Sequence, residues 1–330
     1  MTVTYTVASL VDDTIEHLLG TARSQLNLLK TALLTQSTDY VDTVAMSYNL
    51  NGAVPGAYLS IGDSTSTNPA ETMTILAVNE GTNTCTVLRG QKGSTASAWP
   101  ANTVIEVDPP WPRFSVMKAL RDELRSWGPQ VFQVKSVDIA TQTLIRGYDL
   151  GSIEPYFRVL DVLATPPPTI GSPEYVIYPS GTQSDMAWPS VPFHEIHSAP
   201  GSSIGGFTSG SALIVESFNG VVVPGYLHVI YAAPFDVDDS WTESTDCIAN
   251  VGLDSSDLDI PCYGAAWRLL SFRQVRRMFT NLQGQPRDAQ EVPALAIAQA
   301  AQGFKALRDS RLGDAQYRLM NRFPTRMSVY

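Results

Sequence analysis

The stretch from Arg89 to Phe114, RGQKGSTASAWPANTVIEVDPPWPRF, restricts the fold more than any other part of this chain of 330 residues. The residues before it, TMTILAVNEGTNTCTVL, alternate polar and apolar side chains on either side of a polar turn, which predicts a β-hairpin. Gly90 and Gly93 permit a tight reversal directly after Arg89. Residues 103–107 alternate again, so we expect a further short strand there.

A group of prolines ends this β unit, because proline cannot donate a hydrogen bond to a neighbouring strand. These residues are Pro109, Pro110 and Pro112. From Ser115 the apolar residues recur at helical spacing, which predicts a helix that ends before Gly128-Pro129. Its apolar face consists of Val116, Leu120, Leu124 and Trp127.

Residues 9–34 also show helical spacing. Ser9 is placed to cap this helix, and acidic residues follow near the positive end of the helix dipole. The apolar stripe consists of Ile15, Leu18, Leu19, Ala22, Leu26, Leu29 and Leu33. We therefore expect an N-terminal helix that packs on another element.

Residues 131–233 contain strand-like runs separated by connections rich in proline and glycine, a spacing typical of a sandwich or jelly roll. Helical patterns return after Asp259, with Pro261 in the first turn. Helical regions at the start, middle and end of the chain favour an α+β fold. The predicted architecture is a helical bundle with one small β-barrel or hairpin unit and one β-sandwich-like unit.

The same patterns divide the chain into five predicted segments. They are an N-terminal helix (1–39), a small β unit with the RG turn (40–112), a linking helix (113–130), a β-sandwich-like unit with an acidic loop (131–257) and a basic C-terminal helical region (258–330).

The composition, 44% hydrophobic and 16% charged, is typical of a folded protein. Three cysteines, Cys85, Cys247 and Cys262, are widely spaced and lack CxxC or Cys/His spacing, which favours buried free thiols over disulfides or a zinc site. The N-terminus lacks the cationic and apolar regions of a signal peptide. No run approaches the roughly 18 apolar residues of a membrane span, so we expect no membrane partner.

Charge is distributed unevenly along the chain. From Cys262 onward there are eleven basic and four acidic side chains, a formal charge of +7, which leaves −17 for the remainder of a chain whose net charge is −10. Such asymmetry is expected of a basic tail that contacts something acidic. The arginines expected to bind a partner, at helical spacing or just beyond, are Arg308, Arg311, Arg318, Arg322 and Arg326. A solvated helix face, an acidic neighbouring protein and DNA phosphates remain the alternatives.

Three other patterns partly match catalytic or metal sites. His194-Glu195-Ile196-His197 has its second histidine at i+3, whereas a zinc-protease helix needs i+4, and prolines precede it, so a surface loop is favoured. The acidic run at 235–260 lacks the glycine and glutamate positions of an EF-hand, which favours a charged linker. Gly201 to Gly205, GSSIG, matches a nucleophile elbow centred on Ser203 but follows Pro200 rather than a strand. We expect no catalytic, metal or cofactor-binding residues, and no cofactor.

The RGQKGS turn, the valine strand and the PPWPRF exit into the helix LRDELRSW resemble a pattern that recurs in tailed-bacteriophage virion proteins. In that pattern, His and Gly usually stand where this chain has Trp99 and Asn102. The composite most resembles neck proteins, the head-to-tail connectors or adaptors. In this resemblance Arg89, Gly90 and Gly93 form a structural turn.

The resemblance implies a non-enzymatic virion protein that assembles in the host cytoplasm as a homo-oligomeric ring between portal and tail. Its implied partners are other copies of the chain, the portal protein, tail or neck proteins, and packaged DNA in the lumen. One alternative is a tail-tip, fibre or baseplate protein that binds a host-surface glycan. Another is an enzyme that degrades envelope polysaccharide, since a glycosidase needs only two carboxylates close in space.

Overall fold

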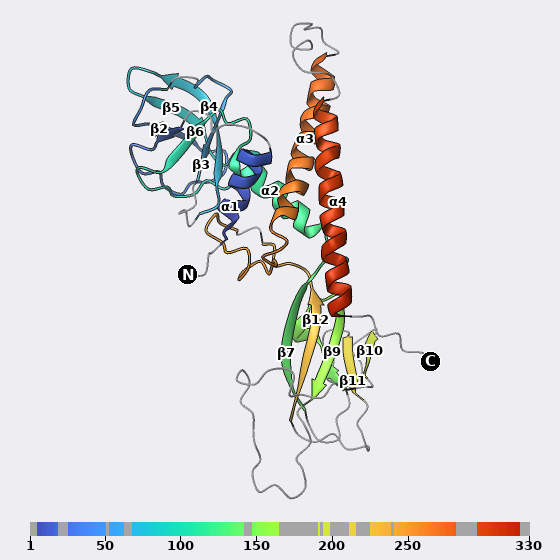
Figure 1. The fold of residues 1–330 in the computed structure, drawn as a ribbon. Helices are drawn as coiled ribbons and strands as arrows, with labels where there is room; N and C mark the ends of the chain where they lie inside the picture. Colours follow the sequence, from blue (N-terminus) through green and yellow to red (C-terminus); the bar gives the residue numbers. More distant parts are fainter. Residues whose placement is uncertain are drawn as a thin grey trace, which may run out of the picture. The chain divides into compact units, whose positions relative to one another are not determined.

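A computed structural model describes residues 5–18, 26–50, 53–62, 68–141, 147–164, 191, 194–198, 211–215, 225–238, 241–281 and 296–323. The chain divides into two compact units (Figure 1). Unit 1 comprises residues 1–127 and 235–318, and unit 2 comprises residues 128–234 and 319–330. Unit 2 is therefore largely an insertion between two parts of unit 1.

Unit 1 contains helices and one six-stranded antiparallel sheet. The helices are α1 (Val7–Asp12), the π-helical turn η1 (Asp13–Leu18), the short turn η2 (Gln91–Gly93), α2 (Arg113–Arg125), α3 (Asp259–Asn281) and α4 (Ala296–Arg322). The strands are β1 (Leu26–Leu28), β2 (Val41–Ala45), β3 (Tyr58–Ile61), β4 (Glu71–Asn79), β5 (Thr84–Leu88) and β6 (Val104–Val107).

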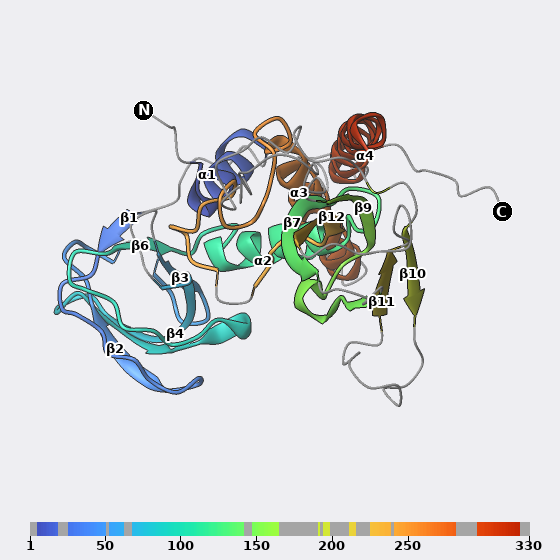
Figure 2. The ribbon, with the colours of Figure 1, turned by 90° about the horizontal axis from the view of Figure 1, so that it is seen from below.

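The sheet has the strand order β1-β6-β3-β4-β5-β2 and curls strongly (Figure 2). Its two edge strands meet beyond β1, where Leu29 bridges Met46. Two backbone hydrogen bonds flank this bridge, from Lys30 N–H to the Ala45 carbonyl at 2.8 Å and from Ser47 N–H to the Leu28 carbonyl at 2.9 Å. The curl leaves little free edge at this end of the sheet, which is one way to limit strand pairing with other chains.

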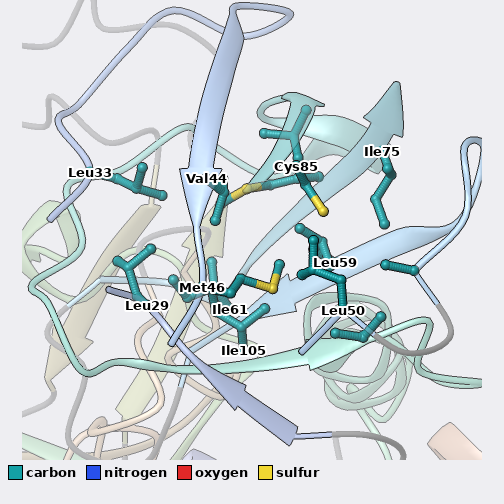
Figure 3. Close-up of a cluster of buried hydrophobic side chains, with 14 of the residues drawn as sticks. Leu29, Leu33, Val44, Met46, Leu50, Leu59, Ile61, Ile75, Cys85 and Ile105 are labelled. Atoms are coloured by element: carbon teal, nitrogen blue, oxygen red, sulfur yellow. The ribbon is translucent and has the colours of Figure 1, made fainter. Parts of the chain in front are cut away.

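Side chains from all parts of the curled sheet fill its interior (Figure 3). Leu29, Leu59, Ile61, Cys85 and Ile105 all lie in this cluster and are almost fully buried. Alternation along each strand directs every second side chain inward. The hairpin expected before the RG turn is present, since β4 and β5 pair antiparallel.

Arg89 follows β5 directly and lies buried within the turn. Its guanidinium donates from Nε to Glu71 Oε1 at 3.0 Å and from Nη2 to Glu71 Oε2 at 2.7 Å. It also donates to the carbonyls of Leu34 and Ser97. One cation thus ties together segments that are far apart in the sequence.

The two residues by which this chain departs from the resembled pattern have clear structural roles after the same turn. Trp99 is buried and donates from Nε1 to Glu71 Oε2 at 2.8 Å. Asn102 has φ +68°, a conformation that glycine adopts readily and asparagine tolerates better than most residues. Asn102 therefore takes the backbone conformation that a glycine would provide there.

Helix α2 packs through the face that the sequence predicts, since Val116, Leu120, Leu124 and Trp127 are all buried. At its start, Arg113 donates from Nη2 to Glu243 Oε2 at 2.8 Å and from Nη1 to Asp12 Oδ1 at 2.6 Å. These bonds connect α2 to the N-terminal helix and to the segment that follows unit 2.

Unit 2 contains two antiparallel three-stranded sheets, with strand orders β10-β11-β8 and β7-β12-β9. Its elements are β7 (Gln133–Thr141), β8 (Gly147–Asp149), the short turn η3 (Gly151–Ile153), β9 (Arg158–Ala164), β10 (His194–Ser198), β11 (Ser211–Val215) and β12 (Gly225–Ala233). Both sheets contribute to one hydrophobic cluster, with Tyr148 and Leu213 from one sheet and Val162 and Val229 from the other. This cluster gives unit 2 a core of its own.

The predicted α+β fold built around a helical bundle is wrong. The structure is a mixed α/β protein with mostly antiparallel sheets, one of them a curled half-barrel. The main error lies in the helix predicted over residues 9–34, because Leu26–Leu28 forms strand β1 and Leu33 bridges Trp99. Asn27 explains the outcome: its buried side chain accepts from Tyr48 N–H at 3.0 Å and donates to the Tyr48 carbonyl at 3.1 Å.

Candidate assembly interface

The basic helix α4 runs antiparallel to α3 within unit 1 (Figure 1). Two contacts fix this direction. Arg311 pairs with Asp259 at the start of α3, whereas Lys305, earlier in α4, lies over the ring of Trp267, about two turns further along α3. Three of the five arginines predicted to bind a partner, Arg308, Arg311 and Arg318, therefore lie next to acidic residues of the same chain.

Glu123 on α2 is the most buried of these acidic partners. Its carboxylate accepts from Arg268 Nε on α3 at 2.8 Å, from Arg308 Nε on α4 at 2.6 Å and from Trp127 Nε1 at 2.9 Å. The Glu123 side chain is fully buried, while those of both arginines are mostly buried. One carboxylate thus joins α2, α3 and α4.

The two arginines share a further partner at the end of α2. Arg268 Nη2 lies 3.1 Å from Ser126 Oγ, and Arg308 Nη2 lies 3.5 Å from the same atom. Arg308 also donates from Nη1 to Asp309 at 2.7 Å. Burial lowers the pKa of Arg308, but its bonds to Asp309 and Glu123 outweigh burial and raise the pKa above its ordinary value.

Two more arginines of α4 contact the turn that begins α3. Arg311 donates from Nε to Asp259 Oδ2 at 2.9 Å and from Nη2 to the Ser256 carbonyl at 2.9 Å, and Arg318 bonds to Asp257. Burial raises the pKa of the Asp257 carboxyl above its usual range, although the bond from Arg318 acts in the opposite direction. The Arg311–Asp259 pair is about one third exposed on both sides, so it is expected to contribute roughly 0.2–1 kcal/mol.

Few apolar side chains support these ion pairs. Among the α4 residues whose burial is described, the buried apolar ones are Ala301, Leu312 and Ala315. Burial of a leucine contributes about 1.5–3 kcal/mol, and alanine contributes less. The docking of this long helix therefore depends strongly on charge.

The opposite face of α4 is exposed and carries apolar side chains. Tyr317 is 67% exposed, and Met320, about one turn later, is 50% exposed. Leu307 is also 50% exposed but lies four residues before Arg311, on the same side of the helix as that arginine. Apart from chain neighbours and the nearby backbone of α4 itself, no heavy atom lies within 4 Å of the position that a Cβ would take at Gly303 or Gly313. This face remains available for contact with another molecule.

The remaining two arginines of the predicted set behave differently. Arg322 is exposed, lies 5.3 Å from the ring centroid of Phe323, and has no carboxylate partner in the described part of the chain. Arg326 lies outside the described residues. The structure thus assigns intramolecular partners to Arg308, Arg311 and Arg318.

Sequence reasoning missed Glu123, which connects the three helices. One signal was available: α2 presents Glu123 next to the apolar Leu124 and four residues before Trp127, a spacing that places Glu123 and Trp127 on one helical face. The structure adds a further contact: a Cβ at Gly264 of α3 would lie 2.2 Å from Glu123 Cδ. Because Gly264 has no side chain, the Glu123 carboxylate can pack against the backbone of α3.

The other patterns singled out in the sequence have separate outcomes. His194 and His197 lie on strand β10, not in the predicted surface loop. GSSIG with Ser203 lies outside the described residues. No cluster of three or more His, Cys, Asp or Glu side chains with metal-site geometry occurs among the residues that the structure describes.

In the acidic run, Asp254 caps a turn by accepting from Ser256 N–H at 2.9 Å, a bond that lowers the pKa of Asp254. Asp257 and Asp259 bind α4, and Glu243 binds Arg113. These four carboxylates are therefore parts of unit 1 rather than a solvated linker.

In the described segments, no helix combines the length and apolar character needed to cross a bilayer. No known family model matches the chain, and the curated proteins include no significant match.

Proposed function

We propose that this protein is a non-enzymatic structural subunit of a tailed-phage virion, a neck or head-to-tail connector that forms an oligomeric ring between portal and tail. The observation that carries the proposal is α4, a helix with two usable faces. One face docks through Arg308, Arg311 and Arg318, and the other exposes Tyr317 and Met320. A subunit that must contact several neighbours needs such surfaces.

The RG turn supports the virion setting of this proposal. In the segment that resembles phage proteins, Arg89 and Trp99 are buried and both donate to the buried carboxylate of Glu71 on β4. These hydrogen bonds stabilise the curled sheet. The proposed partners are other copies of the chain, the portal protein, neighbouring neck or tail proteins and DNA in the lumen.

The mass and symmetry of the purified protein test the proposal. Light scattering and single-particle imaging are expected to give a closed ring whose mass is a multiple of the 35.9 kDa chain. Imaging of intact particles with an antibody against the chain is expected to place it on the portal–tail axis. A trimer at a fibre or baseplate, or a monomer at all concentrations, would exclude the connector role.

A further inference from the structure

We infer that the carboxylates Glu123, Asp257 and Asp259 form an acceptor for α4 that a second copy of this chain also uses, so that α4 is exchanged between neighbouring subunits. This inference rests on the proposed function, because it names the contact by which the ring forms. Its partner is a second copy of the chain, recognised through three arginine–carboxylate pairs.

The acceptor is built by elements other than α4. Glu123 comes from α2, Asp257 precedes α3, and Asp259 is in the first turn of α3. Arg268 of α3 already holds the Glu123 carboxylate at 2.8 Å, so the acceptor keeps an internal support whichever copy supplies α4. Glu123 thus keeps a partner on its own chain that does not belong to α4.

The docking face of α4 is suited to exchange because it is polar. Arg308 projects to Glu123, Arg311 to Asp259 and Arg318 to Asp257, a row of cations that spans about three helical turns. Two of these pairs are partly exposed to solvent, and the buried apolar contribution is limited to Ala301, Leu312 and Ala315. Such an interface separates more easily than an apolar one and forms again with an identical acceptor.

The exposed face of α4 gives exchange an advantage over docking within one chain. In the single chain Tyr317 and Met320, on the face of α4 away from its arginines, are 67% and 50% exposed. A helix placed between two copies contacts the acceptor of one copy with its arginines and lets its other face pack on the copy that supplied it. This buries apolar area that intramolecular docking leaves exposed.

Charge reversal in separate chains tests the exchange. Arg311→Glu places an anion opposite Asp259, and Asp259→Arg places a cation opposite Arg311, so each variant alone has a repulsive contact. Each is expected to need about tenfold more protein than wild type to assemble. An equimolar mixture restores both attractive pairs between chains, and native mass spectrometry is expected to show assembly at wild-type concentration with the two variants in equal amounts.

Two controls make the result interpretable. The double variant Arg311→Glu/Asp259→Arg in one chain restores the pair and shows that both substitutions are compatible with folding, as monitored by circular dichroism. Arg322→Glu changes charge by the same amount on the same helix but faces no carboxylate in the described structure. Arg322→Glu alone is therefore expected to assemble at the wild-type concentration, which would show that the loss in Arg311→Glu comes from the contact with Asp259 and not from the change of charge on α4.

If the wild-type chain assembles but the mixture does no better than its components, α4 stays on its own chain and the exchange is wrong while the connector proposal stands. If the wild-type chain remains a monomer at every concentration, the connector proposal itself fails. The wild-type measurement therefore tests the connector proposal, and the mixture tests the exchange.

Discussion

Arg89 and Glu71 form a two-point ion pair in which both side chains are completely buried. The desolvation of a charge is compensated only while its partner is present. Glu71→Gln is therefore expected to lower the free energy of unfolding by about 3–5 kcal/mol, as measured by urea denaturation.

Asp42 provides the comparison for this prediction, since it contacts the same guanidinium at 3.3 Å with a partly exposed side chain. Asp42→Asn is expected to cost less than about 1 kcal/mol. Equal losses in the free energy of unfolding for Glu71→Gln and Asp42→Asn would show that the buried Glu71 pair stabilises the turn no more than the partly exposed Asp42 pair.

Replacement of glycine by alanine is expected to have opposite effects on stability at Gly264 and at Gly303. At Gly264 a new Cβ would lie 2.2–2.3 Å from Glu123 Cδ and Cγ, so Gly264→Ala displaces the carboxylate that joins α2, α3 and α4. We expect a loss of about 2–4 kcal/mol from overpacking and the disturbed ion pairs, measured by thermal or urea unfolding.

Gly303→Ala has open space at the new methyl group and replaces glycine within a helix. It is expected to raise stability by about 0.5–1 kcal/mol through helix propensity. A stabilised Gly264→Ala variant would contradict the close packing of α3 on α2.

Removal of the Glu123 charge is expected to loosen both α3 and α4. In Glu123→Gln the guanidinium groups of Arg268 and Arg308 lose their shared anion while they remain largely buried, a loss of about 3–5 kcal/mol. Hydrogen exchange is expected to rise along residues 300–318 of α4. Asp309→Asn, which removes an exposed partner of Arg308, is the matched control and is expected to leave α4 protected.

The three thiols are expected to be unreactive in the folded protein. Burial raises the pKa of Cys85 to about 11 and, as the largest cause, those of Cys247 and Cys262 to about 12. Because the thiolate is the reactive form, a disulfide reagent at pH 8 is expected to label none of them until denaturant is added. Rapid labelling of a cysteine in the native protein would contradict the burial of that thiol.

The same shifts predict an alkaline loss of stability. Folded-state pKa values above the ordinary 9.0 mean that the neutral thiols favour folding fully below pH 9, and that this contribution is lost as pH rises from 9 towards 12. Each thiol is expected to contribute up to about 1.4 kcal/mol per pH unit in that window. Cys247→Ala and Cys262→Ala are expected to flatten the decline, after correction for the lost packing.

Local patterns predicted the elements whose partners lie nearby in the sequence. The β4–β5 hairpin and the apolar face of α2 depend on spacing alone, and both are present. Leu26, Leu29 and Leu33 were misassigned because a leucine every three or four residues suits a helix, whereas the buried hydrogen bonds of Asn27 select a strand.

For the interface, the sequence predicted the arginines of α4 but not the carboxylates that they contact. The basic stripe of α4 follows from composition, but its partners Glu123, Asp257 and Asp259 lie 52 to 185 residues away, and only the fold brings them together.

The point where the chain leaves unit 1 lies next to the point where it returns. Trp127 and Phe235 contact each other edge to face, with ring centroids 5.4 Å apart, although 107 residues separate them in the sequence. A short Gly-Ser link between these two positions could therefore replace the whole intervening segment without stretching the scaffold. Evolution has the same freedom: the inserted β unit can be enlarged, exchanged or lost as a cassette while the remainder of the chain keeps its architecture.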